Sequence, residues 1–122
     1  EDPGTRIENR MGEPAANPYL FIASQIIAGL DGIEREDTPW KADDAPYEAH
    51  RPMLPTTLND ALEELNGSTL FRQQLGDTYV DYFIALKQAE LARYKNFIEE
   101  NRDDDAVNGV SQWEQDEYFD FF

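Results

Sequence analysis

Three charged side chains, Arg6, Glu8 and Arg10, stand two residues apart in the 122-residue chain. In an extended segment, alternate residues share one face about 6.8 Å apart, so these three would form a row of cation, anion and cation. Arginine forks suit phosphate and carboxylate groups, and a carboxylate oxygen suits Mg²⁺ or Mn²⁺. Phosphoryl transfer needs both kinds of group. Taken alone, the row fits a ladder of surface salt bridges at least as well.

The elements that must position this row can be read from the surrounding pattern. Polar and apolar residues alternate along "TRIENRM", which predicts a strand over about residues 5–11. A turn marked by Gly12 and Pro14 follows, and Asn17 with Pro18 is typical of a helix start. The apolar run that begins there predicts a core helix over about 18–31.

Four more helices are predicted downstream, over about 57–66, 69–75, 78–100 and 112–121. Short side chains that can accept hydrogen bonds from a first turn mark three of their starts, namely Thr57, Ser68 and Ser111. The residues therefore predict one strand followed by about five helices.

Composition excludes several classes of function. The 26 acidic and 10 basic residues give a net charge of −16, which argues against binding to nucleic acid or to an anionic membrane. The longest apolar run, residues 19–30, is shorter than the roughly 20 apolar residues that a bilayer requires. The chain has no cysteine and no signal-peptide pattern, which suits a cytoplasmic location. The acidity fits either an ordinary solvated surface or adaptation to high salt.

The stretch "RIENRMGEPAANPYL", followed by "AGLDGI", resembles the C-terminal part of the glutamine synthetase catalytic domain. That family has the pattern R-[IL]-E-x-R, a short turn, A-N-P-Y and a helix that ends near A-G-L-x-G-I. The later helices resemble the family more loosely. The resemblance implies that residues 1–122 are a mainly α fragment of an α+β catalytic domain, with one N-terminal active-site strand. A start without Met, in mid-pattern, also suggests a fragment.

The resemblance implies an ATP-dependent ligase that joins glutamate to ammonia or another amine through a γ-glutamyl phosphate. By position, Glu8 matches a metal-binding glutamate for Mg²⁺ or Mn²⁺. Arg10 matches the catalytic arginine that binds glutamate and the transferred phosphate, and Arg6 matches an arginine that reaches the ATP phosphates. Other ligands of the family's site have no counterpart in residues 1–122, so the isolated segment is expected to be inactive.

Two departures from the family pattern bear on substrate and regulation. Many bacterial glutamine synthetases have F-P-D after the strand, where this chain has M-G-E. This difference, with "STLFRQQLG", is closer to the branch that uses larger amines, such as the γ-glutamylpolyamine synthetases. The loop around Tyr47 reads A-P-Y-E-A and does not match the L-Y-D-L-P adenylylation motif. The acceptor amine cannot be read from these residues.

The resemblance also implies a homo-oligomer, a dodecamer of two hexameric rings whose C-terminal segments lock the rings together. The aromatic tail is therefore expected to contact another subunit, through Trp113, Tyr118, Phe119, Phe121 and Phe122. The alternative is that the tail folds back on its own long helix. Two other classes of protein stay open: a non-catalytic helical interaction module related to the family, and a small acidic helical binding protein whose charged row is a set of surface salt bridges.

Overall fold

The computed structural model describes residues 4–6, 8–9, 12, 15–39, 41, 44, 52–101 and 110–119. This part contains five helices: α1 (Pro18–Glu34), α2 (Leu58–Gly67), α3 (Thr69–Leu75), α4 (Asp77–Asn101) and α5 (Gln112–Tyr118). The prediction of a mainly helical chain with about five helices is confirmed. Within the described ranges, no helix is both long enough and apolar enough to cross a bilayer.

The predicted strand over residues 5–11 is not seen in the described part of the chain. Residues 5, 6, 8 and 9 are described and none is in a strand, while Ile7, Arg10 and Met11 lie outside the described residues. The physical reason is that a strand needs a hydrogen-bonded neighbour, since its backbone groups cannot pair within the segment. The described residues contain no second strand to serve as that neighbour.

Helix α1 begins at the predicted residue and ends later than predicted. The Asn17 side-chain oxygen accepts hydrogen bonds from the backbone N–H groups of Tyr19 at 3.0 Å and Leu20 at 3.2 Å. Gly32, just beyond the predicted end at about residue 31, stays within the helix. The chain leaves the helix at Glu36, whose φ of 55° is left-handed, and so α1 extends to Glu34.

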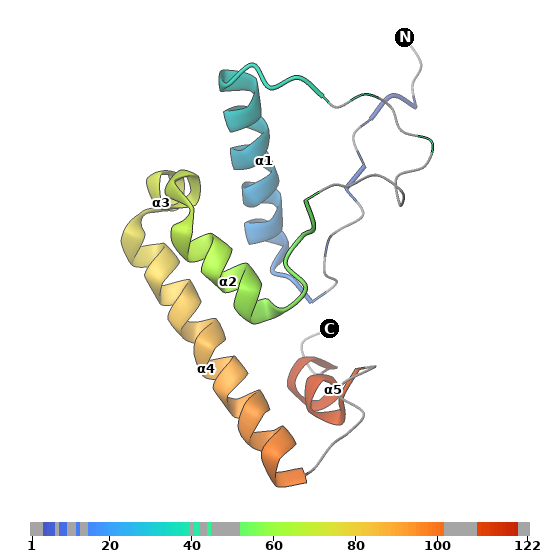
Figure 1. The fold of residues 1–122 in the computed structure, drawn as a ribbon, viewed down its shortest axis with the longest axis vertical. Coiled ribbons are helices and arrows are strands. Elements are labelled where there is room, and N and C mark those ends of the chain that lie inside the picture. The colour runs from blue at the N-terminus through green and yellow to red at the C-terminus, as the bar shows by residue number, and fades with distance from the viewer. Residues whose placement is uncertain are drawn as a thin grey trace.

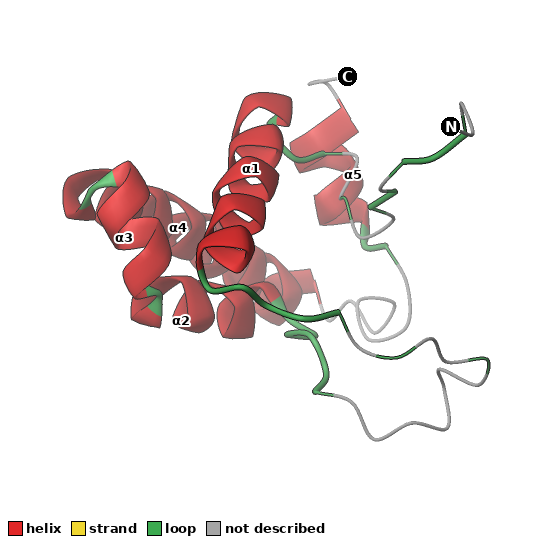
Figure 2. Ribbon diagram, turned by 90° about the horizontal axis from the view of Figure 1, so that it is seen from above, coloured by secondary structure: helices red, strands yellow, loops and turns green. Residues whose placement is uncertain are grey.

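The core lies between α2 and α4. Leu62 of α2 packs with Val80 and Ile84 of α4, and these three side chains are buried. Half-buried apolar side chains surround them, from Leu65, Leu75, Phe83 and Leu91. Figure 1 shows α2 and α3 against the first half of α4, and Figure 2 shows that α2, α3 and α4 lie on one side of α1.

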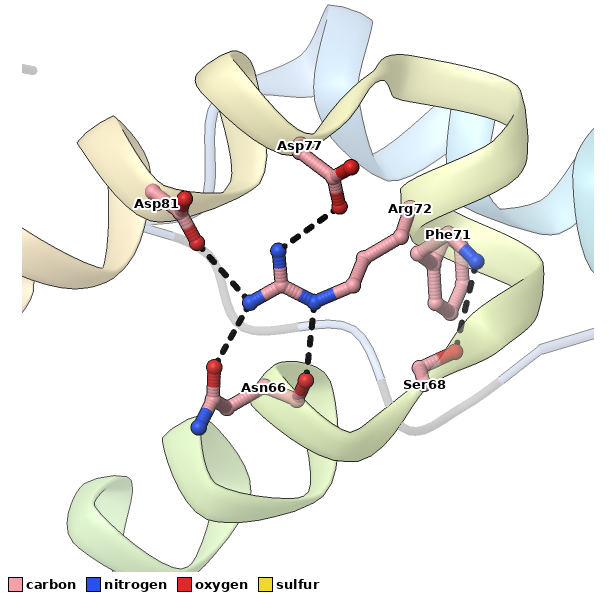
Figure 3. A network of polar contacts seen from close by, with 6 residues as sticks. All are labelled: Asn66, Ser68, Phe71, Arg72, Asp77 and Asp81. Atoms are coloured by element: carbon pink, nitrogen blue, oxygen red, sulfur yellow. Dashed lines mark hydrogen bonds and ion pairs between the residues drawn. The ribbon is translucent and has the colours of Figure 1, made fainter.

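Arg72 fixes the junction of α2, α3 and α4 (Figure 3). Its guanidinium donates to the backbone and side-chain oxygens of Asn66 at 2.9 and 2.6 Å. It also donates to Asp77 at 2.9 Å and to Asp81 at 2.8 Å, and these hydrogen bonds raise the pKa of Arg72 further. Gly76 makes the turn between α3 and α4 with a φ of 86°, in the left-handed region that favours glycine.

Truncation of the central leucine tests where the core lies. Leu62→Ala should lower the free energy of unfolding by about 2–5 kcal/mol, because it removes a buried side chain and leaves a cavity. Leu86→Ala on α4 is the matched control, since Leu86 is 51% exposed and should change stability by about 0.5 kcal/mol or less. Urea unfolding followed by far-ultraviolet circular dichroism measures both. Equal effects would place the core elsewhere.

Candidate functional site

The segment that carries the charged row lies against α1. The Asn9 side-chain nitrogen donates to the Gln25 side-chain oxygen of α1 at 2.6 Å. Gly12 lies so close to the same helix that a Cβ added there would be 3.2 Å from the Phe21 ring. These two contacts, at Asn9 and Gly12, connect the segment to α1 on the C-terminal side of Glu8.

Two of the three predicted site residues are described, and both are exposed. Arg6 donates from its guanidinium to the backbone oxygen of Gly4 at 3.4 Å. Glu8 lies in the same exposed segment, two residues away. Arg10, the predicted catalytic residue, lies outside the described residues. The structure therefore offers the side chains of Arg6 and Glu8 at the surface, where a ligand could reach them.

A metal ion would need more ligands than the described residues bring together. Glu8 offers a hard carboxylate oxygen, which is the right type of donor for Mg²⁺ or Mn²⁺. The described ranges contain no group of three His, Cys, Asp or Glu side chains that could hold a metal ion. Glu8 therefore offers a single oxygen donor of the right type, and the described residues do not assemble a metal site around it.

A cavity of about 920 Å³ lies between α1 and the other four helices. Its walls are mostly apolar and rich in aromatic rings, including those of Phe21, Phe71, Tyr79, Phe83, Tyr118 and Phe119. Helical periodicity cannot predict a space left between helices. This cavity could therefore not be predicted from the sequence.

Helix α5 folds back on the second half of α4. The Trp113 ring lies between the rings of Tyr94, at 5.3 Å and 57°, and Tyr118, at 6.3 Å and 86°, both suitable tilted aromatic contacts. The Tyr118 hydroxyl donates to Glu90 of α4, whose other oxygen pairs with Lys87 at 2.7 Å.

Both ends of α5 are fixed by polar contacts. Ser111, which is buried, forms a capping box with Glu114. The backbone N–H of Ser111 donates to the Glu114 carboxylate at 2.8 Å, and the backbone N–H of Glu114 donates to the Ser111 hydroxyl oxygen at 3.2 Å. Near the other end, Glu117 pairs with Arg93 of α4. A seven-residue helix is marginal alone, so these contacts and the aromatic rings stabilise it.

Trp113 and Tyr118 of α5 pack on α4 of their own chain, as the alternative interpretation of the tail predicts. The reason is that α4 presents Tyr94 and Glu90 on one face, one helical turn apart, and they match an aromatic ring and a hydroxyl. The expected contact of the tail with another subunit stays a prediction. Phe119 is 79% exposed and stays available for a partner, while Phe121 and Phe122 lie outside the described residues.

Burial raises the pKa of Tyr118 above its ordinary value, and the hydrogen bond to Glu90 raises it further. The folded chain therefore holds the hydroxyl proton more tightly than the unfolded chain. This contribution to stability is complete below about pH 10 and is lost as the pH rises above that value.

The contact of α5 with α4 should consequently weaken above about pH 10. Trp113 fluorescence in a Trp40→Phe background reports the contact. The fluorescence change above pH 10 should be smaller in Tyr118→Phe, which has no proton to lose. Tyr82→Phe is the control, because Tyr82 is 65% exposed and should leave the profile unchanged. Identical profiles for Tyr118→Phe and the parent would show that this hydroxyl does not hold α5.

Comparison with known protein families matches residues 1–104 to the glutamine synthetase catalytic domain. The chain is 50% identical over 119 residues to a γ-glutamylanilide synthase of an Acinetobacter species, which covers 97% of this chain and 24% of that protein. It is 38% identical over 102 residues to human lengsin, covering 81% of this chain and 20% of lengsin.

It is also 35% identical over 125 residues to the glutamine synthetase of Pyrococcus furiosus, covering 95% of this chain and 28% of that enzyme. No solved structure gives a match. The family match extends over most of the chain and includes the charged row and α1 to α4. The chain belongs to the glutamine synthetase catalytic domain family. It spans about a quarter of the length of the curated relatives it matches.

Proposed function

We propose that this chain is the C-terminal part of a catalytic domain that joins the γ-carboxylate of glutamate to an amine, with hydrolysis of ATP to ADP and phosphate. The observation that supports this most directly is the R-I-E-N-R row, held against α1 by Asn9 and Gly12 in a member of this family. The 50% identity to a γ-glutamylanilide synthase favours an aromatic amine such as aniline as acceptor, because an anilide is the amide of aniline.

The reaction has two steps in this proposal. A γ-carboxylate oxygen of glutamate attacks the γ-phosphorus of ATP, and the bond to the ADP oxygen breaks to give γ-glutamyl phosphate and ADP. The amine nitrogen then attacks the acyl carbon, loses a proton and releases inorganic phosphate. Arg10 binds the glutamate and the transferred phosphate, and Arg6 binds the ATP phosphates, since guanidinium groups pair with oxyanions in two-pronged geometry.

Glu8 supplies one oxygen ligand to the divalent ion of the site. When bound, Mg²⁺ or Mn²⁺ would neutralise charge on the ATP phosphates. The exposed position of the Glu8 side chain leaves room for ATP and for the remaining ligands. Those ligands, like the amine pocket, belong to parts of the domain that are not among residues 1–122.

In the whole domain, residues 5–11 become a strand, because neighbouring strands would satisfy backbone groups that have no strand neighbour among the described residues. The whole protein then assembles as two hexameric rings in the cytoplasm. Phe119, at the C-terminal end of α5, is exposed and contributes to contacts between rings.

A chimera tests the function directly. Residues 1–122 replace the matching quarter of the Acinetobacter relative, and the product is assayed for release of ADP and phosphate with glutamate and aniline, ammonia or putrescine. The expected result is amide formation that needs ATP, with whichever amine the pocket of the relative accepts. A folded chimera that makes no amide would favour a non-catalytic module instead.

In that chimera, Glu8→Gln should lower turnover by roughly 100-fold or more, because the amide keeps the shape but not the charge of a metal ligand. The apparent affinity for Mg²⁺ or Mn²⁺ should fall as well. Glu34→Gln at the end of α1 is the matched control and should leave the kinetics unchanged. Wild-type rate and metal affinity in Glu8→Gln would contradict the metal role.

Arg10→Lys should raise the KM for glutamate, lower kcat, or both, by roughly 10-fold or more, since lysine cannot make a two-pronged contact with an oxyanion. Arg35→Lys is the control, because Arg35 pairs with Asp31 and Asp37 at the end of α1. Steady-state kinetics with varied glutamate and ATP separate the two effects. Unchanged kinetics in Arg10→Lys would remove Arg10 from the site.

A further inference from the structure

Two polar residues, Ser24 and Gln25, interrupt the apolar sequence of α1 near its middle. The other residues from 20 to 30 have apolar side chains or none, and Gln25 is the only side-chain amide within the helix. A polar residue on an otherwise apolar surface can select one arrangement of neighbouring segments over another, as a single asparagine does in coiled coils.

Both polar residues belong to one short series of hydrogen bonds. The Ser24 hydroxyl donates to the backbone oxygen of Phe21 at 2.7 Å. The Gln25 side-chain nitrogen donates to the Ser24 hydroxyl oxygen at 3.4 Å. The Gln25 side-chain oxygen is then the acceptor for the Asn9 side-chain nitrogen at 2.6 Å. Ser24 therefore helps to orient the Gln25 amide, so that its oxygen accepts from the segment that carries the charged row.

Asn9 stands between Glu8 and Arg10 in that segment. In an extended segment, successive side chains point to opposite faces. A segment whose Asn9 faces α1 therefore turns Glu8 and Arg10 to the face away from α1. The apolar residues of "TRIENRM" alternate with the charged ones, so they share the phase of Asn9.

The segment stays close to α1 beyond Asn9. A Cβ added to Gly12 would be 3.2 Å from the Phe21 ring. Phe21 and Gln25 are four residues apart, so they lie on one face of the helix, one turn apart. The segment thus runs along this face toward the start of α1, with Asn9 nearer the middle of the helix and Gly12 nearer its beginning.

We propose that Gln25, through its hydrogen bond with Asn9, is a positioning residue that determines how the charged row is presented to substrates. The proposal rests on the proposed function, in which the row binds ATP, glutamate and a divalent ion. Because alternate side chains share a face, a shift of one residue would turn Glu8 away from these ligands. Gln25 acts through Asn9 and not on the substrates themselves.

The hydrogen bond to Gln25 supplies what apolar packing cannot. Apolar contacts are not directional, so a mainly apolar face of the segment could pack at several points along an apolar helix. Asn9 is the polar residue of that face, and it meets the side-chain amide of α1 at one point only. Both partners are exposed, so the bond adds little to stability and its loss should leave the helices folded.

A nuclear magnetic resonance measurement on the 122-residue chain tests the positioning without any assay of activity. The α protons of Gly12 lie beside the Phe21 ring, whose ring current shifts their resonances. In Gln25→Leu these resonances should move most of the way toward those of an unstructured glycine, while the helical circular dichroism stays that of the parent. Gln88→Leu is the control, because Gln88 is an exposed amide on α4. Unchanged Gly12 resonances in Gln25→Leu would overturn the proposal.

An exchange of the two amides tests whether they act as a pair in the chimera with the Acinetobacter relative. Gln25→Asn shortens the acceptor by one methylene and Asn9→Gln lengthens the donor by one. Each single variant should lower kcat and the apparent affinity for Mg²⁺ by roughly 10-fold, as loss of a residue that orients a metal ligand commonly does. The double variant should recover most of both, and the KM for the amine should stay unchanged in all three.

A merely structural role would not give this recovery. Single variants with the parent's kinetics, or impaired single variants without recovery in the double variant, would show that the two amides do not position the row as a pair. An inactive chimera, with the expected response of Gly12 in the 122-residue chain, would refute the proposed function and leave the positioning by Gln25 standing. An active chimera that ignores Gln25→Asn would refute the positioning alone.

Discussion

The packing of α2 against α4 is the interaction on which the rest of the described structure depends. Leu62, Val80 and Ile84 are its only fully buried apolar side chains among the described residues, and α3 is tied to the same pair by Arg72. Helix α5 then packs on the second half of α4, and α1 packs on α3 and the cavity wall. Each later contact uses a surface that the α2–α4 pair has already placed.

This order has a consequence for the charged row. Asn9 contacts Gln25 and Gly12 lies against Phe21, so the segment that carries Arg6 and Glu8 rests on α1. Helix α1 contributes no buried side chain of its own, so this support lies outside the buried core of α2 and α4.

Local signals in the sequence predicted the starts of the helices well. Asn17, Thr57, Ser68 and Ser111 each accept a hydrogen bond from the first turn of the helix that follows, as their side chains allow without help from distant residues. Contacts between distant residues were not predictable in this way. Arg72 reaches from α3 to both Asn66 and Asp81, and no local pattern specifies which carboxylates it meets. The same limit applies to the contact of the C-terminal tail with α4, which the sequence offers only as the alternative.

The charged row shows the same contrast between local signals and contacts with distant residues. The alternation of polar and apolar residues in this segment predicts a strand. Every second residue lies on one face only when the segment is extended. Whether the segment pairs into a sheet depends on other strands, and a single edge in water gains too little from hydrogen bonds to hold itself extended. The type and spacing of the side chains in residues 6–10 therefore predict which ligands they suit. Whether these residues form a strand depends on polypeptide outside them.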